Sequence, residues 1–79
     1  MEVDVRIFIM PKKDILDPAT KAVTKTLQSL GYDISQINLG KCINLKMKKD
    51  KNIRKRIEEI CQKVLVNELT EDYYYSILH

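Results

Sequence analysis

The 79-residue sequence has few of the residues from which active sites are usually built. Its one histidine is His79, and its only glycines are Gly31 and Gly40, so neither a Ser-His-Asp arrangement nor a glycine-rich phosphate loop is indicated. It has no tryptophan, and its two cysteines, Cys42 and Cys61, fit no metal-ligand spacing. We therefore predict no catalytic residues, no cofactor-binding residues and no metal ligands, and we expect two reduced thiols.

Long hydrophobic runs are also absent. No apolar stretch approaches the roughly 20 residues that a transmembrane helix needs. The segment Met1–Arg6 alternates charged and apolar side chains, unlike the continuous apolar stretch of a signal peptide. The length fits a single domain over residues 1–79, and so small a core gives limited stability. We expect a soluble cytoplasmic protein that forms a homodimer or tetramer.

The hydrophobic pattern that is present predicts an α+β fold. Its periodicity switches between two and about 3.6 residues, which gives the order strand, helix, strand, helix, strand. The expected strands cover about residues 3–9, 34–47 and 72–77, and the expected helices about residues 18–30 and 53–65. Asp17-Pro18 is a typical helix start, while Gly31 and Asn67 can supply left-handed helix ends. We predict a three-stranded sheet with both amphipathic helices packed on one face.

The middle strand is unusually long. Apolar and polar residues alternate from Ile34 to Met47, and this segment is longer than the usual strand of about 3–10 residues. Gly40 near its centre suggests a bend or a bulge. Because the alternation stays in phase across Gly40, we favour one bent strand. A tight hairpin at Leu39–Cys42 is the alternative.

Lys41 is an unusual residue in this strand. Counted from Ile37, it falls on the apolar face. Either a bend at Gly40 turns it outward, or its stem lies along the sheet with the ammonium group in water. The functional alternative is a charged anchor at a subunit contact.

The last strand carries three consecutive tyrosines. Tyr73 and Tyr75 share one face and Tyr74 lies on the other. An outward-facing tyrosine is a favoured interface residue, because it brings contact area and a polar group at low entropic cost. We select Lys41, Asp72, Tyr73 and Tyr74 as candidate interface residues, with Tyr74 the best single candidate.

A basic run extends from Lys46 to Arg56. It could contact phosphate groups, and a nucleic-acid-binding α+β module is therefore one alternative function. However, Asp50 dilutes the run, and no aromatic residue is interleaved with it to stack on bases. A small-molecule regulatory domain acting at a dimer interface is a second alternative.

Several segments together resemble the PurS family, the small subunit of bacterial and archaeal phosphoribosylformylglycinamidine synthase. The resemblance covers nearly the whole chain, and its C-terminal part is the most specific. The matching segments are Leu16-Asp17-Pro18 with Ala22-Val23, Gly40-Lys41, and Cys61–Asn67 followed by Glu71-Asp72-Tyr73 and Tyr75.

Two residues depart from the family pattern. Thr20 stands where the family usually has glycine, a change that favours the helix. Thr70 stands where the family usually has an apolar residue, which affects burial of the connection before the last strand.

The resemblance implies a non-catalytic assembly subunit of an ATP- and glutamine-dependent ligase in de novo purine biosynthesis. Its expected partners are the glutaminase and synthetase subunits of the same complex. It would bridge the two and support the transfer of ammonia between them. This expectation agrees with the scarcity of catalytic residue types in the sequence.

Overall fold

A computed structural model describes residues 1–13, 15 and 18–78 of the chain. In chain order the elements are β1 (Glu2–Pro11), α1 (Pro18–Ser29), β2 (Lys41–Lys48), α2 (Ile53–Ile60), a π-helical turn η1 (Cys61–Leu65) and β3 (Glu71–Leu78). The α+β class and the order β-α-β-α-β are therefore confirmed. The expected cap residue, Asp17, lies outside the described residues.

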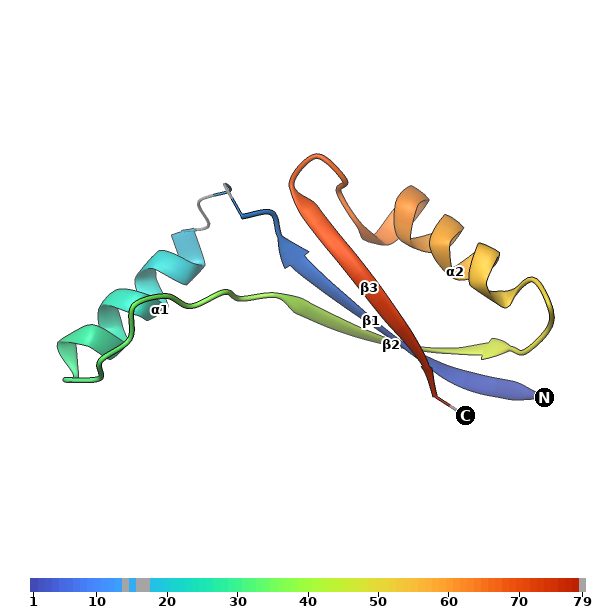
Figure 1. The fold of residues 1–79 in the computed structure, drawn as a ribbon, viewed down its shortest axis with the longest axis horizontal. Helices are drawn as coiled ribbons and strands as arrows, with labels where there is room; N and C mark the ends of the chain where they lie inside the picture. Colours follow the sequence, from blue (N-terminus) through green and yellow to red (C-terminus); the bar gives the residue numbers. More distant parts are fainter. Residues whose placement is uncertain (14, 16–17, 79) are drawn as a thin grey trace.

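The three strands form one antiparallel sheet with β1 in the centre and the order β2-β1-β3 (Figure 1). The register places Ile7 opposite Ile43 on one side and Tyr75 on the other. Side chains of directly paired residues point to the same face, so the alternation of β1 defines two faces of the sheet. We call the face that carries Ile7 the core face and the opposite one the open face.

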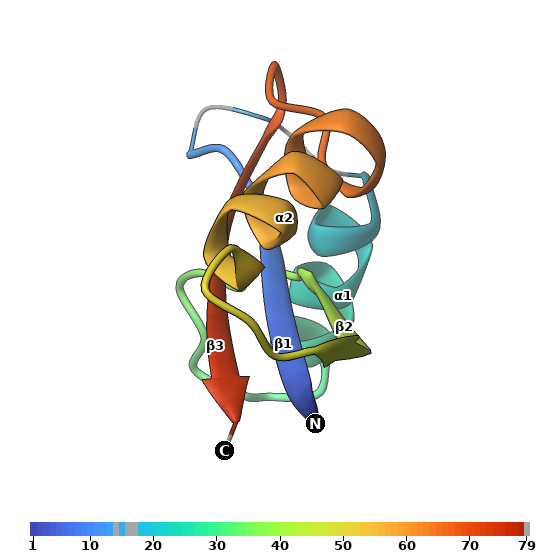
Figure 2. The same cartoon turned by 90° about the vertical axis from the view of Figure 1, so that its right-hand side faces the viewer.

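Helix α2 and the turn η1 cover the core face (Figure 2). Ile53 and Ile57 of α2 and Cys61 of η1 are buried against the alternating residues of β1. The buried core consists of Val3, Val5, Ile7, Ile9, Ile53, Ile57, Cys61 and Val66. Burial of these apolar side chains is the main force that holds α2 on the sheet.

Helix α1 does not pack on the sheet. It lies beyond the end of the strands (Figure 1), and none of its residues is buried. Val23 and Leu30, from its apolar stripe, remain 38% and 67% exposed. The prediction that both helices pack on one face is thus correct for α2 and wrong for α1. An apolar stripe indicates that a helix is covered, but it does not say by which surface.

Strand β2 is shorter than predicted. It begins at Lys41, and residues 34–40 precede it as an unpaired segment that runs from the end of α1 to the sheet (Figure 1). The hairpin alternative is also wrong, because β2 pairs only with β1 in the described part of the chain. Pairing with β1 ends at the Ile9–Lys41 pair, close to Pro11, which has no N–H to donate to a ladder.

Two helix ends were predicted to use left-handed residues. Gly31 does so, with φ of 94°, two residues after the last residue of α1, Ser29. Asn67 does not, since no described residue other than glycine has a positive φ. Instead the Asn67 side-chain oxygen accepts a hydrogen bond from the Leu69 N–H at 3.1 Å, and its carbonyl accepts from the N–H groups of Thr70 and Glu71. Asn67 therefore organises the turn into β3.

Candidate interaction site

The start of β2 passes very close to the end of β1. A Cβ atom added to Gly40 would lie 2.5 Å from the carbonyl oxygen of Ile9 and would overlap the sulfur of Met10. Only glycine permits this approach without a shift of the backbone. The close passage fixes the position of the next residue, Lys41, at the end of the core face.

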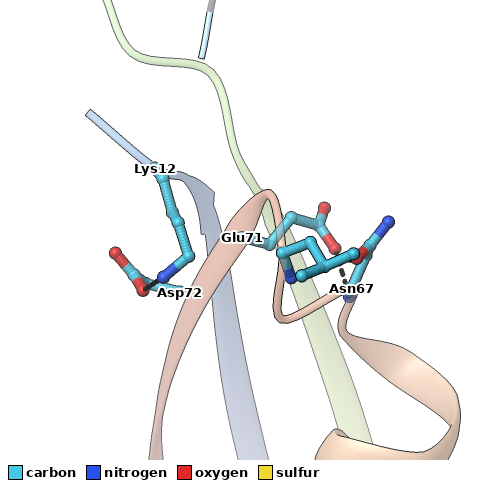
Figure 3. Close-up of polar contacts among 5 residues, drawn as sticks. Lys12, Asn67, Glu71 and Asp72 are labelled. Carbon is cyan, nitrogen blue, oxygen red and sulfur yellow. Dashed lines mark hydrogen bonds and ion pairs between the residues drawn. The ribbon is translucent and has the colours of Figure 1, made fainter. Parts of the chain in front are cut away.

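Lys41 forms an ion pair across the sheet. Its ammonium nitrogen lies 3.3 Å from Oε2 of Glu71, while its side chain remains 62% exposed. The other carboxylate oxygen of Glu71 accepts a hydrogen bond from the Asn67 N–H at 2.9 Å (Figure 3). The Asn67 N–H, followed by Lys41, lowers the pKa of Glu71. Lys41 thus stays on the core face, as its phase predicts, with its ammonium group beside Glu71 and most of its side chain exposed.

A second ion pair lies on the open face at the same end of the sheet. Nζ of Lys12 lies 2.6 Å from Oδ1 of Asp72, and both side chains are well exposed (Figure 3). Asp72 and Glu71 are adjacent in sequence but point to opposite faces and bind different lysines. They therefore do not form a carboxylate pair for acid–base chemistry, in agreement with the alternation of the strand.

The two candidate tyrosines lie on opposite faces of β3. Tyr73 is half-buried on the core face, and its hydroxyl oxygen accepts a hydrogen bond from Nε2 of Gln62 at 3.3 Å. Tyr74 is 59% exposed on the open face and stacks on Phe8, with ring centroids 5.0 Å apart. Tyr73 therefore contributes to packing of the core, whereas Tyr74 offers an aromatic surface to solvent.

The open face is apolar towards one end and polar towards the other. Phe8 lies between Tyr74 and Cys42 in neighbouring strands, and Met10 follows it in β1. Further along, Arg6 donates a hydrogen bond to the Asn44 side chain at 3.1 Å. No described helix covers this face, since α2 and η1 lie on the other one. Exposed aromatic and apolar groups surrounded by polar ones are typical of protein-binding surfaces.

The groups that could support chemistry are sparse in the part of the chain that the structure describes. No cluster there brings three metal-ligating side chains together. Cys42 is exposed and Cys61 is buried, and burial raises the pKa of the Cys61 thiol. No described helix is long and apolar enough to span a bilayer.

The structure brings only some of the candidate residues together. Lys41, Asp72 and Tyr74 are exposed near one end of the sheet, but Tyr73 faces the core. Sequence reasoning missed Lys12 as the partner of Asp72 and Phe8 as the partner of Tyr74. Both contacts depend on the register between β1 and β3, which local patterns do not reveal. The one available signal for Phe8 was that it is apolar, whereas the residues before it on the same face of β1 are charged.

The fold is that of a small α+β protein with one uncovered sheet face and one uncovered helix. A sequence model of the PurS family, described as phosphoribosylformylglycinamidine (FGAM) synthase, matches residues 4–79. The chain is 35% identical over 75 residues to the PurS subunit of that synthase from Synechocystis, covering 91% of this chain and 75% of the relative. The chain therefore belongs to the PurS family.

Solved structures support the same assignment. Bacillus subtilis PurS superposes with a TM-score of 0.89 at 30% identity, and the match covers 100% of both chains. The structure of PurLQS from Thermotoga maritima contains a chain that matches with a TM-score of 0.86 at 21% identity. That match covers 99% of each chain, and at this identity it supports a common fold alone. The three-stranded sheet and two helices are thus an established PurS arrangement.

Proposed function

We propose that this chain is the non-catalytic assembly subunit of phosphoribosylformylglycinamidine synthase in purine biosynthesis. It bridges the glutaminase and the ATP-dependent synthetase of that complex in the cytoplasm and supports ammonia transfer between them. It does so as a homodimer or tetramer. The observation that carries the proposal is a PurS-family chain with two uncovered surfaces, the open face and α1.

The physical need for such a subunit follows from the chemistry of ammonia. Ammonia released into water is diluted and protonated, so the site that produces it and the site that uses it must be docked together and kept dry. Docking requires surfaces with apolar centres and polar rims. The stacked pair of Phe8 and Tyr74 supplies such a centre, and the exposed Lys12–Asp72 ion pair lies beside it.

Lys41 is a second charged group that is placed to contribute to a subunit contact. One carboxylate oxygen of Glu71 binds the Lys41 ammonium group, and the other accepts a hydrogen bond from the Asn67 N–H. The hydrogen bond holds the carboxylate in place, and the carboxylate in turn restrains the lysine. A charge held in place in this way loses less entropy on binding than a free lysine side chain. We propose Lys41, Asp72 and Tyr74 as contact residues and Tyr73 as a support for the strand that carries them.

Deletion of the gene tests the proposal. We expect a purine auxotroph that grows again when the intact chain is supplied. The tagged chain, expressed in its native cell, should also co-purify the synthetase and the glutaminase. Normal growth of the deletion strain without purines would refute the proposal.

The alternative of nucleic-acid binding is weakened by the contacts of its basic run. Arg56 lies 2.7 Å from Asp50 and also donates to the carbonyl of Lys48, while Lys46 lies 4.0 Å from Asp4. Such paired groups offer less free positive charge to phosphates. Salt-dependent binding of RNA or DNA by the pure chain would favour this alternative.

The regulatory alternative is tested separately by thermal shift. A specific ligand that binds the folded state raises the unfolding temperature by mass action. We expect no shift with amino acids or nucleotides, and a clear shift with one of them would favour a ligand-sensing role.

A further inference from the structure

A groove lies between α1, the connection that precedes it and the segment that follows it. Its volume is about 350 Å³, at the low end of the roughly 300–1,000 Å³ that is typical of binding sites. On one side, Nε2 of Gln28 in α1 donates a hydrogen bond to the carbonyl of Ile34 at 2.9 Å. On the other, the N–H of Lys12 donates to the carbonyl of Thr70 at 2.8 Å. We call this space the lysine groove, after the lysines that line it: Lys12, Lys13, Lys21 and Lys25.

The lysine groove carries an excess of positive charge. Lys21 and Lys25 are four residues apart on α1, so their side chains project from the same face of the helix. Lys12 and Lys13 reach the groove from the connection before α1. Lys12 is paired with Asp72. The other three lysines are exposed, and none of them forms an ion pair within the part of the chain that the structure describes.

The local sequence retains this excess when all of its charges are counted. From residue 12 to residue 25 it contains four lysines and two aspartates, which leaves a net charge of +2. The two aspartates, Asp14 and Asp17, lie outside the described residues. Several unpaired ammonium groups on two neighbouring elements favour a partner that brings more than one negative charge.

The rest of the lining suits a peptide better than a nucleic acid. Ile15, which is 42% exposed, and Ile37 supply apolar surface, while Gln36 and Asn38 supply amide groups. No aromatic side chain is among the described lining residues, so none of them can stack on a base. A peptide that combines carboxylates with apolar side chains would use all of these groups.

We propose that the lysine groove binds an acidic segment of another subunit of the complex, in which carboxylates alternate with apolar residues. This inference rests on the proposed function and names the chemistry of one of its contacts. The carboxylates pair with the ammonium groups of Lys13, Lys21 and Lys25, and an apolar side chain between them lies on Ile15. A second copy of this chain is a poorer partner, because its formal net charge is +3.

Peptide binding to the pure full-length chain tests the groove. The probe is a fluorescein-labelled peptide of about eight residues in which glutamate alternates with alanine, and glutamine replaces each glutamate in the control peptide. We expect fluorescence anisotropy to show binding of the acidic peptide only. The affinity should fall as the salt concentration rises from about 0.1 M to about 1 M, because the Debye length then falls from about 10 Å to about 3 Å.

Charge reversal on α1 locates the binding. Lys21→Glu combined with Lys25→Glu should weaken binding of the acidic peptide about tenfold or more. The matched control combines Lys51→Glu with Lys55→Glu, which are also exposed and four residues apart but lie outside the groove. It changes the net charge by the same amount and should bind like the wild type. If charge reversal disturbs α1, Lys21→Gln with Lys25→Gln should still lower the affinity, and circular dichroism checks the fold of each variant.

Three results would overturn the groove as a binding site. They are no binding of the acidic peptide, an equal loss of affinity in the two double glutamate variants, and tighter binding of an oligouridine of similar length than of the peptide.

Co-purification separates this inference from the proposed function. The tagged chain with Lys21→Glu and Lys25→Glu should recover less of the synthetase or of the glutaminase than the control variant does. Full recovery of both subunits by that chain would overturn only the groove. Failure of the wild-type chain to recover either subunit would overturn the bridging role, and peptide binding would then decide on the groove alone.

Discussion

At the scale of single residues, the close passage at Gly40 leaves little room for a side chain. The two nearest obstacles to a side chain there differ in kind, since the Met10 thioether can move and the Ile9 carbonyl cannot move without the strand. We expect Gly40→Ala to lower the free energy of unfolding by about 1–3 kcal/mol. Chemical denaturation at a fixed protein concentration measures this change.

A second substitution identifies the cause. Met10→Ala removes the movable obstacle, so adding it to Gly40→Ala should not restore full stability, because the conflict with the Ile9 carbonyl remains. Full recovery in the double variant would show that the backbone contact is unimportant.

Glu71 gives a testable dependence of stability on pH. Its pKa in the folded chain is lowered below the ordinary value of 4.5, mainly by the Asn67 N–H and then by Lys41. A carboxyl with a lowered folded pKa contributes stability above its unfolded pKa and loses that contribution as pH falls through its folded pKa. We therefore expect the wild-type chain to lose stability as pH falls below 4.5, and Glu71→Gln to lose less over that range.

Thermal unfolding of both proteins across this pH range makes the comparison. Asp50 also has a lowered pKa, owing first to Arg56, so it contributes with the same sign in both proteins and cancels in the difference. The exposed helix residue Glu59 supplies a control as Glu59→Gln. Identical pH dependence for Glu71→Gln and the wild type would show that Glu71 does not contribute to the loss of stability at low pH.

At the scale of elements, the open face is the surface that the proposed function uses most directly. Tyr74→Ala removes the exposed ring that stacks on Phe8 and leaves the core face intact. We expect affinity for the other two subunits to fall about tenfold or more, as for a central aromatic residue of an interface. Titration calorimetry with each subunit measures the change.

The matched control is Ser76→Ala, on the same strand and the same face but away from the aromatic row. It should bind like the wild type. If Tyr74→Ala also binds like the wild type, the open face is not the contact surface.

The elements also show where sequence reasoning succeeds and where it stops. Alternation located β1 and β3 to within about two residues, and the Pro18 start and Gly31 end of α1 were found from local chemistry. The same alternation overextended β2 to Ile34, because a period of two reports which side a residue faces and not whether a neighbouring strand exists.

The candidate site shows the same division. Exposure of Tyr74 and Asp72 followed from the phase of the last strand, and the structure agrees. The placement of Tyr73 against Gln62 and the pairing of Lys12 with Asp72 depend on contacts across 11 and 60 residues of sequence. No local pattern contains that information, so these contacts could not be predicted.

At the scale of the whole molecule, the chain buries one face of its sheet and leaves the other face and α1 uncovered. Among the described residues, eight are buried, and they make a core that is small for the surface the chain exposes. Under the proposed function, a chain of this size would gain stability by association, and the same uncovered surfaces would bind the other subunits. The free energy of association would then be part of the stability of the assembled protein.

Reconstitution of the synthase from purified subunits tests the central claim most directly. The rate of amide transfer to formylglycinamide ribonucleotide is measured with glutamine and with ammonium, each with and without this chain. We predict that only the glutamine-dependent rate requires the chain, and that the isolated chain turns over no substrate. An unchanged glutamine-dependent rate without the chain, or turnover by the chain alone, would contradict the account.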